Sequence, residues 1–140
     1  MANQIYPCLW FDGNAKAAAE FYCSVFKDSK IMADTPMVVT FELNGEKFMG
    51  LNGGPNFTFN EAVSFVVECE TQDEIDHYWS RLTEGGKESV CGWLKDKHGV
   101  SWQIVPAILG KLMTDPEKAP RVFKAFQNMV KFDIETLLKA

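Results

Sequence analysis

The chain has little of what marks nucleic-acid-binding, membrane and secreted proteins. Acidic residues outnumber basic ones by 19 to 14, and no stretch gathers Lys and Arg, so neither a nucleic acid nor an anionic membrane surface is an expected partner. No apolar run approaches the ~20 residues that a membrane span needs. The first residues lack the basic and apolar regions of a signal peptide. We therefore expect no nucleic acid, no membrane and a cytoplasmic location.

Cysteine and histidine are also scarce. The four cysteines are irregularly spaced and form no C-x-x-C pair, so the sequence indicates no disulfides and a reducing compartment. Of the two histidines, His77 is expected on the solvent side of a helix and His98 in a tight turn. Neither has an evident carboxylate to orient it, and both are interpreted as solvated rather than catalytic.

What the sequence does contain is one series of signals that occurs twice. Asn14 can cap a helix over residues 15–26, and Asn44-Gly45 favours a two-residue hairpin. Thr71 can cap a second helix, and Asp96–Gly99 can close a second hairpin. Two units in the same order predict a duplicated architecture, which tends to place its functional site where the halves meet.

These signals predict an α+β fold in a single domain of residues 1–140. Module one covers about 4–56, module two about 62–106, and a helical extension about 107–140. In the extension, the pattern predicts a helix that ends near Lys131 and a last helix over 134–139 capped by Asp133. We expect this tail to pack on its own domain rather than to serve only as a dimer arm.

Several short strings together resemble one known family. They are Leu9–Ala15, Phe21-Tyr22, Leu51–Pro55, Cys91–Lys97 and Gly99–Ile104. The chain from about residue 5 to 135 resembles the PhnB-like branch, labelled demethylubiquinone 3-methyltransferase-like, of the vicinal oxygen chelate superfamily, which includes glyoxalase I and the bleomycin-resistance proteins. The resemblance implies tandem β-α-β-β-β modules forming a curved mixed sheet, a cup-shaped pocket and a homodimer.

The resemblance also allows a test for metal. In metal-using members, each module supplies one ligand from its first strand and one from its last. Aligning the helix caps and the hairpin turns of the two modules puts these positions at Pro7, Met49, Ser64 and Gln103, of which Gln103 alone is a plausible oxygen donor. A catalytic divalent ion needs about three ligands from His, Glu, Asp or Cys. The sequence therefore predicts no metal. It also predicts no cofactor, since no glycine-rich strand-to-helix turn is present for S-adenosylmethionine.

Gln103 is the residue of greatest interest in the predicted cup. If Gly99 forms a bulge, Trp93 lies opposite Gln103, and otherwise Gly92 does. The amide then either anchors a ligand beside an apolar wall or bonds a neighbouring group in a cup packed shut. The predicted pocket residues are Pro7, Leu9, Met49, Asn52, Ser64, Trp93 and Gln103.

The leading functional hypothesis is a metal-free protein that binds a small apolar or aromatic molecule in this cup. The alternative is an enzyme of the same superfamily, either of lyase or isomerase type or a methyltransferase acting on a quinol-like substrate. That alternative needs acid–base groups, which an inward-pointing Glu42 or Glu68 would supply. A third hypothesis is an interaction module whose cup is filled by its own side chains.

Overall fold

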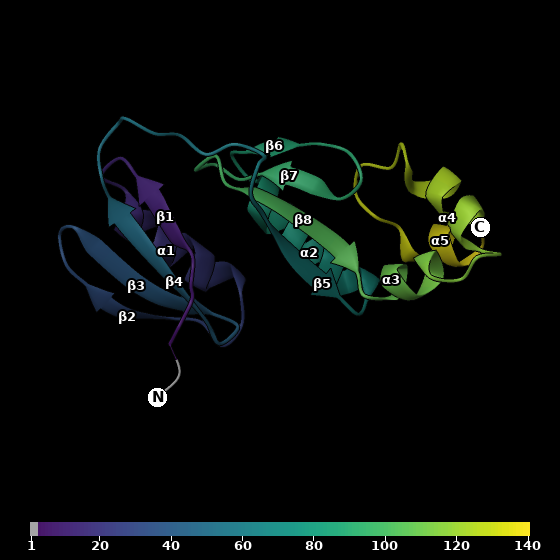
Figure 1. The fold of residues 1–140 in the computed structure, drawn as a ribbon, viewed down its shortest axis with the longest axis horizontal. Helices are drawn as coiled ribbons and strands as arrows, with labels where there is room; N and C mark the ends of the chain where they lie inside the picture. Colours follow the sequence, from purple (N-terminus) through teal and green to yellow (C-terminus); the bar gives the residue numbers. More distant parts are fainter. Residues whose placement is uncertain (1–2) are drawn as a thin grey trace. The chain divides into compact units, whose positions relative to one another are not determined.

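The computed structural model describes residues 3–140, and these form two compact units. The first ends at Phe59 and the second runs from Asn60 to Ala140. Each unit has β-α-β-β-β order and a four-stranded mixed sheet with a helix on one face (Figure 1). The predicted α+β fold of two repeated modules with C-terminal helices is confirmed, while the single-domain organisation stays a prediction.

The first unit contains β1 (Cys8–Phe11), α1 (Ala15–Val25), β2 (Lys30–Asp34), β3 (Val38–Leu43) and β4 (Glu46–Asn52). The strand order is β1-β4-β3-β2, with β1 parallel to β4 and the other pairs antiparallel. Asn44 and Gly45 have φ angles of 52° and 83°. Two positive φ angles are what a type I′ turn requires, so the predicted two-residue hairpin is confirmed.

The α1 helix covers one face of this sheet because its inner surface is small and apolar. Ala15 and Ala18 are fully buried, and the Tyr22 ring stacks on Phe41 with centroids 6.3 Å apart. A Cβ added to Gly50 would lie 3.1 Å from the Ala15 Cβ, so helix and strand approach closely there. Among residues 3–59 α1 is the single helix. We call the sheet face away from α1 the open face of this unit.

The second unit contains β5 (Ser64–Cys69), α2 (Gln72–Thr83), β6 (Lys87–Glu88), β7 (Trp93–Lys95) and β8 (Ser101–Pro106). Its strand order is β5-β8-β7-β6, the same pattern as in the first unit, and β6 is a strand that the sequence reading did not identify. Thr71 caps α2 in a capping box with Glu74, as predicted. The sheet face away from α2 is the open face of this unit.

The turn between β7 and β8 is built around a buried carboxylate. Asp96 is 3% exposed, and its Oδ1 accepts hydrogen bonds from the backbone N–H groups of His98 at 2.8 Å and Val100 at 3.1 Å. Its Oδ2 accepts one from Trp102 Nε1 at 2.8 Å. Gly99, with φ 88°, donates its N–H to the Asp96 carbonyl at 2.9 Å. These bonds fix the register of the hairpin that carries the candidate site.

The tail forms α3 (Ile108–Met113), α4 (Ala119–Phe126) and α5 (Ile134–Leu138). Asp133 caps α5 through a bond from Thr136 N at 3.0 Å, as predicted. The predicted helix up to Lys131 was too long, and α3 was not predicted. After α4 the chain leaves helical geometry because the carbonyls of Met129 and Val130 accept hydrogen bonds from the N–H groups of Cys91 and Gly92.

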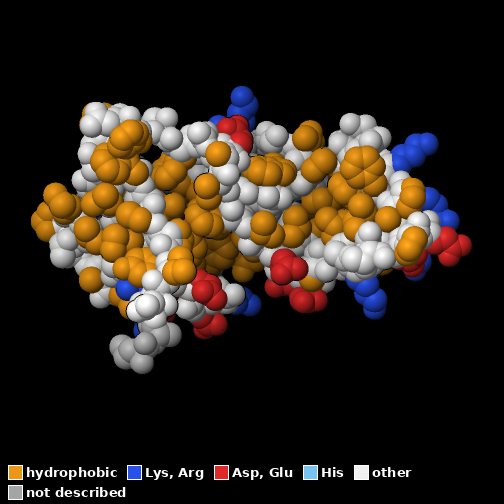
Figure 2. All heavy atoms as spheres, in the orientation of Figure 1, with side chains coloured by type: hydrophobic (Ala, Val, Ile, Leu, Met, Phe, Trp, Pro, Cys, Tyr) orange, Lys and Arg blue, Asp and Glu red, His pale blue; other side chains and the backbone are white. Residues whose placement is uncertain are grey.

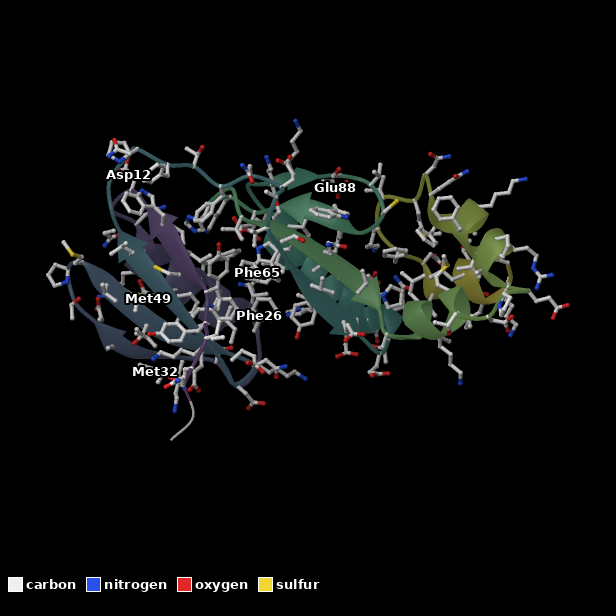
Figure 3. The ribbon with its side chains drawn as sticks, viewed as in Figure 1. Asp12, Phe26, Met32, Met49, Phe65 and Glu88 are labelled. Carbon is white, nitrogen blue, oxygen red and sulfur yellow. The ribbon has the colours of Figure 1, made fainter. Side chains whose placement is uncertain are left out.

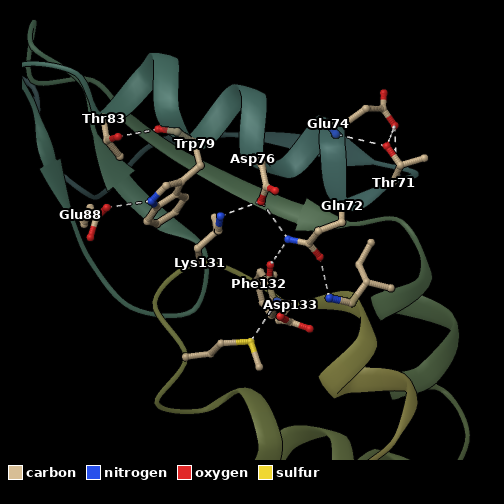
Figure 4. Close-up of polar contacts among 12 residues, drawn as sticks. Thr71, Gln72, Glu74, Asp76, Trp79, Thr83, Glu88, Lys131, Phe132 and Asp133 are labelled. Atoms are coloured by element: carbon tan, nitrogen blue, oxygen red, sulfur yellow. Dashed lines mark hydrogen bonds and ion pairs between the residues drawn. The ribbon is translucent and has the colours of Figure 1, made fainter.

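The tail is attached to α2 through Gln72 (Figure 4). The Gln72 amide donates to the Phe132 carbonyl at 2.9 Å and accepts from Ile134 N at 2.8 Å. Lys131 pairs with Asp76 at 2.7 Å. These contacts confirm that the tail packs on its own unit. Among residues 3–140, none of the helices combines the length and hydropathy needed to cross a bilayer, and all four cysteines are free thiols.

Candidate functional site

Two rows of side chains cross the open face of the second unit. Directly paired residues in a sheet point to the same side, so the strand register defines each row. The polar row consists of Ser64, Ser101, Lys95 and Lys87. The second row lies two residues further along β8 and consists of Val66, Gln103 and Trp93. We call it the aromatic row after Trp93. The intervening Trp102 and Ile104 are buried on the α2 side.

The two rows meet in a direct contact. Gln103 Nε2 donates a hydrogen bond of 2.9 Å to Ser64 Oγ, and Trp93 lies opposite Gln103 in the hairpin register. Of the two registers left open by the sequence, the structure has the one with Trp93 as the neighbour. Ser64, Trp93 and Gln103, all predicted as pocket residues, are therefore brought together on one face.

A pocket of about 220 Å³ is lined by Trp93 and Ser101, which are the pairing partners of Gln103 and Ser64. Its lining residues are Glu61, Lys87, Glu88, Ser89, Trp93, Leu94, Lys95 and Ser101. Lys95 Nζ lies 3.0 Å from Glu61 Oε2, and this hydrogen bond lowers the pKa of the Glu61 carboxyl group. In the space-filling view, basic and acidic side chains adjoin one another over β6 (Figure 2). These charged residues were not predicted as site residues from the sequence. Once Trp93 is paired with Gln103, the strand register places Lys95 opposite Ser101 and Lys87 opposite Lys95.

In the first unit, the strand register places three predicted pocket residues away from the open face. Leu9 pairs with Gly50 on the α1 side and is 7% exposed. Asn52 is also on that side, where its Oδ1 accepts from Ala15 N at 2.9 Å and its Nδ2 donates to the Pro36 carbonyl at 2.9 Å. Asn52 thus caps α1. Met49 lies on the open face opposite Cys8 (Figure 3).

Pro7 is the third of these residues. The first-strand position that the sequence assigned to Pro7 belongs to the preceding residue, Tyr6. Cys8 pairs with Met49 as Val66 pairs with Gln103, so the counterpart of Ser64 is Tyr6, not Pro7. Lys47 Nζ lies 4.2 Å from the centre of the Tyr6 ring, consistent with a shared face. The error arose because the β1–α1 connection, Asp12-Gly13-Asn14, is one residue longer than Glu70-Thr71. A slip of one residue moves a side chain to the other face.

Comparison with known proteins identifies the family. The family model described as 3-demethylubiquinone-9 3-methyltransferase matches residues 3–105. The chain belongs to this family. A solved structure described as a putative 3-demethylubiquinone-9 3-methyltransferase, PhnB protein, from Bacillus cereus is 35% identical, with 75% of this chain and 100% of that chain covered and a TM-score of 0.68. The PhnB description and the demethylubiquinone methyltransferase label are those that the resemblance predicted.

More distant structures share the fold alone. The fosfomycin resistance protein FosX from Listeria monocytogenes, solved with Mn(II) and sulfate, is 13% identical with a TM-score of 0.61, covering 81% of this chain and 97% of that chain. Lactoylglutathione lyase from Agrobacterium tumefaciens is 14% identical with a TM-score of 0.52, covering 78% and 96%. None of the curated proteins matches the chain.

The donor set of this family member does not fit a divalent metal ion. The four positions in strand register are Tyr6, Met49, Ser64 and Gln103. They contain none of the His, Glu, Asp or Cys ligands on which such sites depend. In the part of the chain that the structure describes, no three His, Cys, Asp or Glu side chains are grouped so as to hold an ion.

The methyltransferase description implies S-adenosylmethionine, and the residues present do not fit its usual cradle. That cradle is a glycine-rich turn between a strand and a helix of a parallel sheet. Within residues 3–140 both sheets are mixed, and Gly13 is the one glycine in the two connections that join a first strand to its helix.

The remaining candidates for acid–base chemistry differ in position. His77 is exposed, and burial lowers the pKa of the half-buried His98 imidazole. Burial and then Glu74 raise the pKa of the Cys69 thiol to about 12, which suppresses the nucleophilic thiolate. Glu68 pairs with Val105 and Glu42 with Lys47, so both carboxylates lie on open faces.

Proposed function

We propose that the protein binds a small apolar or aromatic molecule, without a metal ion, on the open face of the second unit. The observation that carries this proposal is the hydrogen bond from Gln103 to Ser64, which holds the amide opposite Trp93 beside the pocket. Binding sites for small molecules combine apolar walls with a few placed polar groups. The indole of Trp93 supplies the wall and the Gln103 amide supplies the polar anchor.

An aromatic ligand suits this arrangement better than a purely polar one. Val66, 55% exposed, adds apolar surface next to Gln103, and Trp93 offers a flat face for offset or edge-on ring contacts. In the first unit, Met49 on the open face is the predicted pocket residue that fits the same role. Contacts from Pro7, Leu9 and Asn52 stay sequence predictions that their position on the α1 side does not support.

Fluorescence titration tests the proposal. The protein is titrated with aromatic metabolites and aromatic antibiotics, and a saturable change in tryptophan emission is expected. The change should be lost in Trp93→Phe, because Trp79 and Trp102 are buried in the second unit and Trp10 belongs to the first unit. Gln103→Leu should weaken binding by about tenfold, the effect of losing one well-placed hydrogen bond. An emission change that persists in Trp93→Phe, or no change with any compound, would contradict the proposal.

A second candidate function is catalysis by a member of this superfamily. The observation in its favour is the position of Glu68 on the same open face as Gln103, two residues along β5 from Val66. A carboxylate there is available as a general base. Methyl transfer from S-adenosylmethionine to a quinol precursor, or isomerisation of a bound ligand, is the activity to assay. Activity that Glu68→Gln abolishes would favour the enzyme.

We further propose that the protein acts as a cytoplasmic homodimer. Soluble oligomers are most often twofold symmetric, and large hydrophobic side chains such as Val63, Phe57 and Phe123 are at least half exposed. Light scattering should give twice the 15.8 kDa mass of one chain. A mass of one chain at every concentration would contradict the dimer.

A further inference from the structure

The pocket beside Trp93 contains a pair of lysines that face each other. Lys87 and Lys95 are directly opposite on the antiparallel strands β6 and β7, and both line the pocket. Like charges in this position repel. Glu61 neutralises Lys95 at 3.0 Å. Among the residues that the structure describes, no carboxylate lies within 4.0 Å of the Lys87 ammonium group. With two lysines and two glutamates in its lining, the pocket has no net charge, but the Lys87 ammonium group is the one that no ion pair neutralises there.

The second observation is a buried hydroxyl group without a partner. Ser101 is 1% exposed, it lines the same pocket, and its Oγ makes no hydrogen bond. Buried polar atoms in native structures are nearly always hydrogen-bonded, so the Ser101 hydroxyl is available to a group bound in the pocket. Ser101 pairs directly with Lys95 in the polar row. The Ser101 hydroxyl and the ammonium groups of Lys87 and Lys95 therefore all belong to residues that line the same pocket.

The other carboxylate at the pocket is directed elsewhere. Glu88 pairs with Leu94, which is buried on the α2 side, and its Oε1 accepts a hydrogen bond of 2.9 Å from Trp79 Nε1 (Figure 4). Glu61 is different, because its carboxylate contacts a pocket lysine and both partners of that ion pair are partly exposed, at 64% and 37%. Exposed ion pairs contribute little to stability, so exchange of Glu61 for another anion costs little.

We propose that the ligand of this site carries an anionic group, a carboxylate or a phosphate, that replaces Glu61 on Lys95. The same group is bound by Lys87 and by the Ser101 hydroxyl, which becomes accessible when the Lys95 side chain turns from Glu61 to the ligand. The apolar part of the ligand then lies against Trp93. This inference rests on the proposed function and narrows the ligand to a small aromatic acid.

Binding measured by calorimetry and by amide chemical shifts tests the inference with four probes: phenyl phosphate, benzoate, inorganic phosphate and neutral benzyl alcohol. Phenyl phosphate should bind at least ~10-fold more tightly than benzyl alcohol, and the difference should shrink with added salt. Lys87→Met and Lys95→Met should each weaken the acids by about tenfold and leave benzyl alcohol unchanged. Lys124→Met, at an exposed lysine of α4, is the matched control.

The Glu61→Gln variant distinguishes competition between Glu61 and the ligand from a purely structural role of Glu61. Removal of the competing carboxylate should tighten binding of both acids about threefold or more, whereas loss of a structural ion pair would weaken it. Ser101→Ala should weaken the acids and preserve the fold, because its hydroxyl makes no bond in the protein. Amide spectra confirm that each variant is folded.

The outcomes separate this inference from the function on which it rests. Equal affinity for phenyl phosphate and benzyl alcohol, with no effect of Lys87→Met or Glu61→Gln, overturns the anionic site and leaves aromatic binding intact. Binding of inorganic phosphate that requires Lys87, without any effect of Trp93→Phe on phenyl phosphate, supports the anionic site and contradicts the aromatic one. Absence of binding by all three anions at millimolar concentration overturns the inference.

Discussion

At the scale of single residues, Asp96 has the largest expected effect on the site, although it does not line the pocket. Its carboxylate accepts hydrogen bonds from two backbone N–H groups and from Trp102 Nε1 inside the second unit. Asp96→Ala leaves these donors buried without a partner and should destabilise the protein by about 3 kcal/mol. Urea denaturation measures the change. Asp12→Ala, at an exposed loop position (Figure 3), is the control and should change stability little. If Asp96→Ala lost as little stability as Asp12→Ala, the role given to Asp96 in the turn would be contradicted.

His98 gives the turn a pH dependence of known sign. Burial lowers the pKa of its imidazole in the folded protein, while Asp96 acts in the opposite direction. The unfolded chain therefore binds more protons between the folded pKa and about 6.5. The free energy of unfolding should fall as the pH decreases below that value. In His98→Gln, thermal unfolding between pH 7 and pH 5 should depend less on pH, whereas His77→Gln, at an exposed position, is the matched control. A steeper dependence in His98→Gln would show that the sign is wrong.

Single residues also mark the limit of reasoning from the sequence. Asn14 and Thr71 both occupy helix N-cap positions, but Asn14 makes no side-chain cap bond, and aligning the two residues misplaced the first-strand position by one residue. No periodic pattern in the sequence gives the length of a strand-to-helix connection. The pairing of Cys8 with Met49 was therefore needed to decide whether Pro7 or Tyr6 lies on the open face. Lys87, Lys95 and Ser101 were missed for a related reason, because their shared face depends on the register of three strands.

At the scale of elements, Gly92 is where the tail meets the β7–β8 hairpin. Its φ is 80°, and a Cβ added there would lie 2.6 Å from the Ile104 carbonyl oxygen and 2.6 Å from the Phe132 ring. Gly92→Ala should therefore cost the left-handed strain of about 1 kcal/mol and a further ~2 kcal/mol from steric overlap.

Gly45→Ala is the matched control for this substitution. Gly45 has almost the same φ, 83°, but open space around the added Cβ. Its alanine variant should lose about 1 kcal/mol from backbone strain alone. Chemical denaturation of both variants measures the difference. Equal losses would mean that the tail moves away from Gly92 without cost, and that the packing of Phe132 contributes little.

The elements themselves differed in how well the sequence predicted them. The α2 helix and the Asn44-Gly45 hairpin have local causes, a capping box and a turn dipeptide, and both were found. The end of α4 has a tertiary cause, since Met129 and Val130 bond to the loop at Cys91 and Gly92. No pattern within residues 107–140 reports a partner so distant in the chain.

At the scale of the whole molecule, the duplication applies to the architecture and not to the chemistry. Both sheets have the same strand order, but hydrophobic side chains predominate over the first unit in the space-filling view (Figure 2), whereas the second unit carries the polar row. The fold was predictable because two repeated β-α-β-β signals and several family strings agree. The charged pocket was not, because duplication predicts equivalent positions and these positions have diverged.

That divergence gives a prediction about metal. With Tyr6, Met49, Ser64 and Gln103 at the positions in strand register, the purified protein should retain no stoichiometric divalent ion. Treatment with EDTA should leave the melting temperature and the binding of aromatic probes unchanged, because neither depends on an ion. Mass spectrometry of dialysed protein measures the metal content. Ser64→His with Val66→His and Gln103→Glu is the positive control, since it puts three good ligands at neighbouring positions of one face, and it should acquire affinity for zinc. Equimolar zinc, nickel or manganese in the native protein, or a melting temperature lowered by EDTA, would contradict the metal-free site.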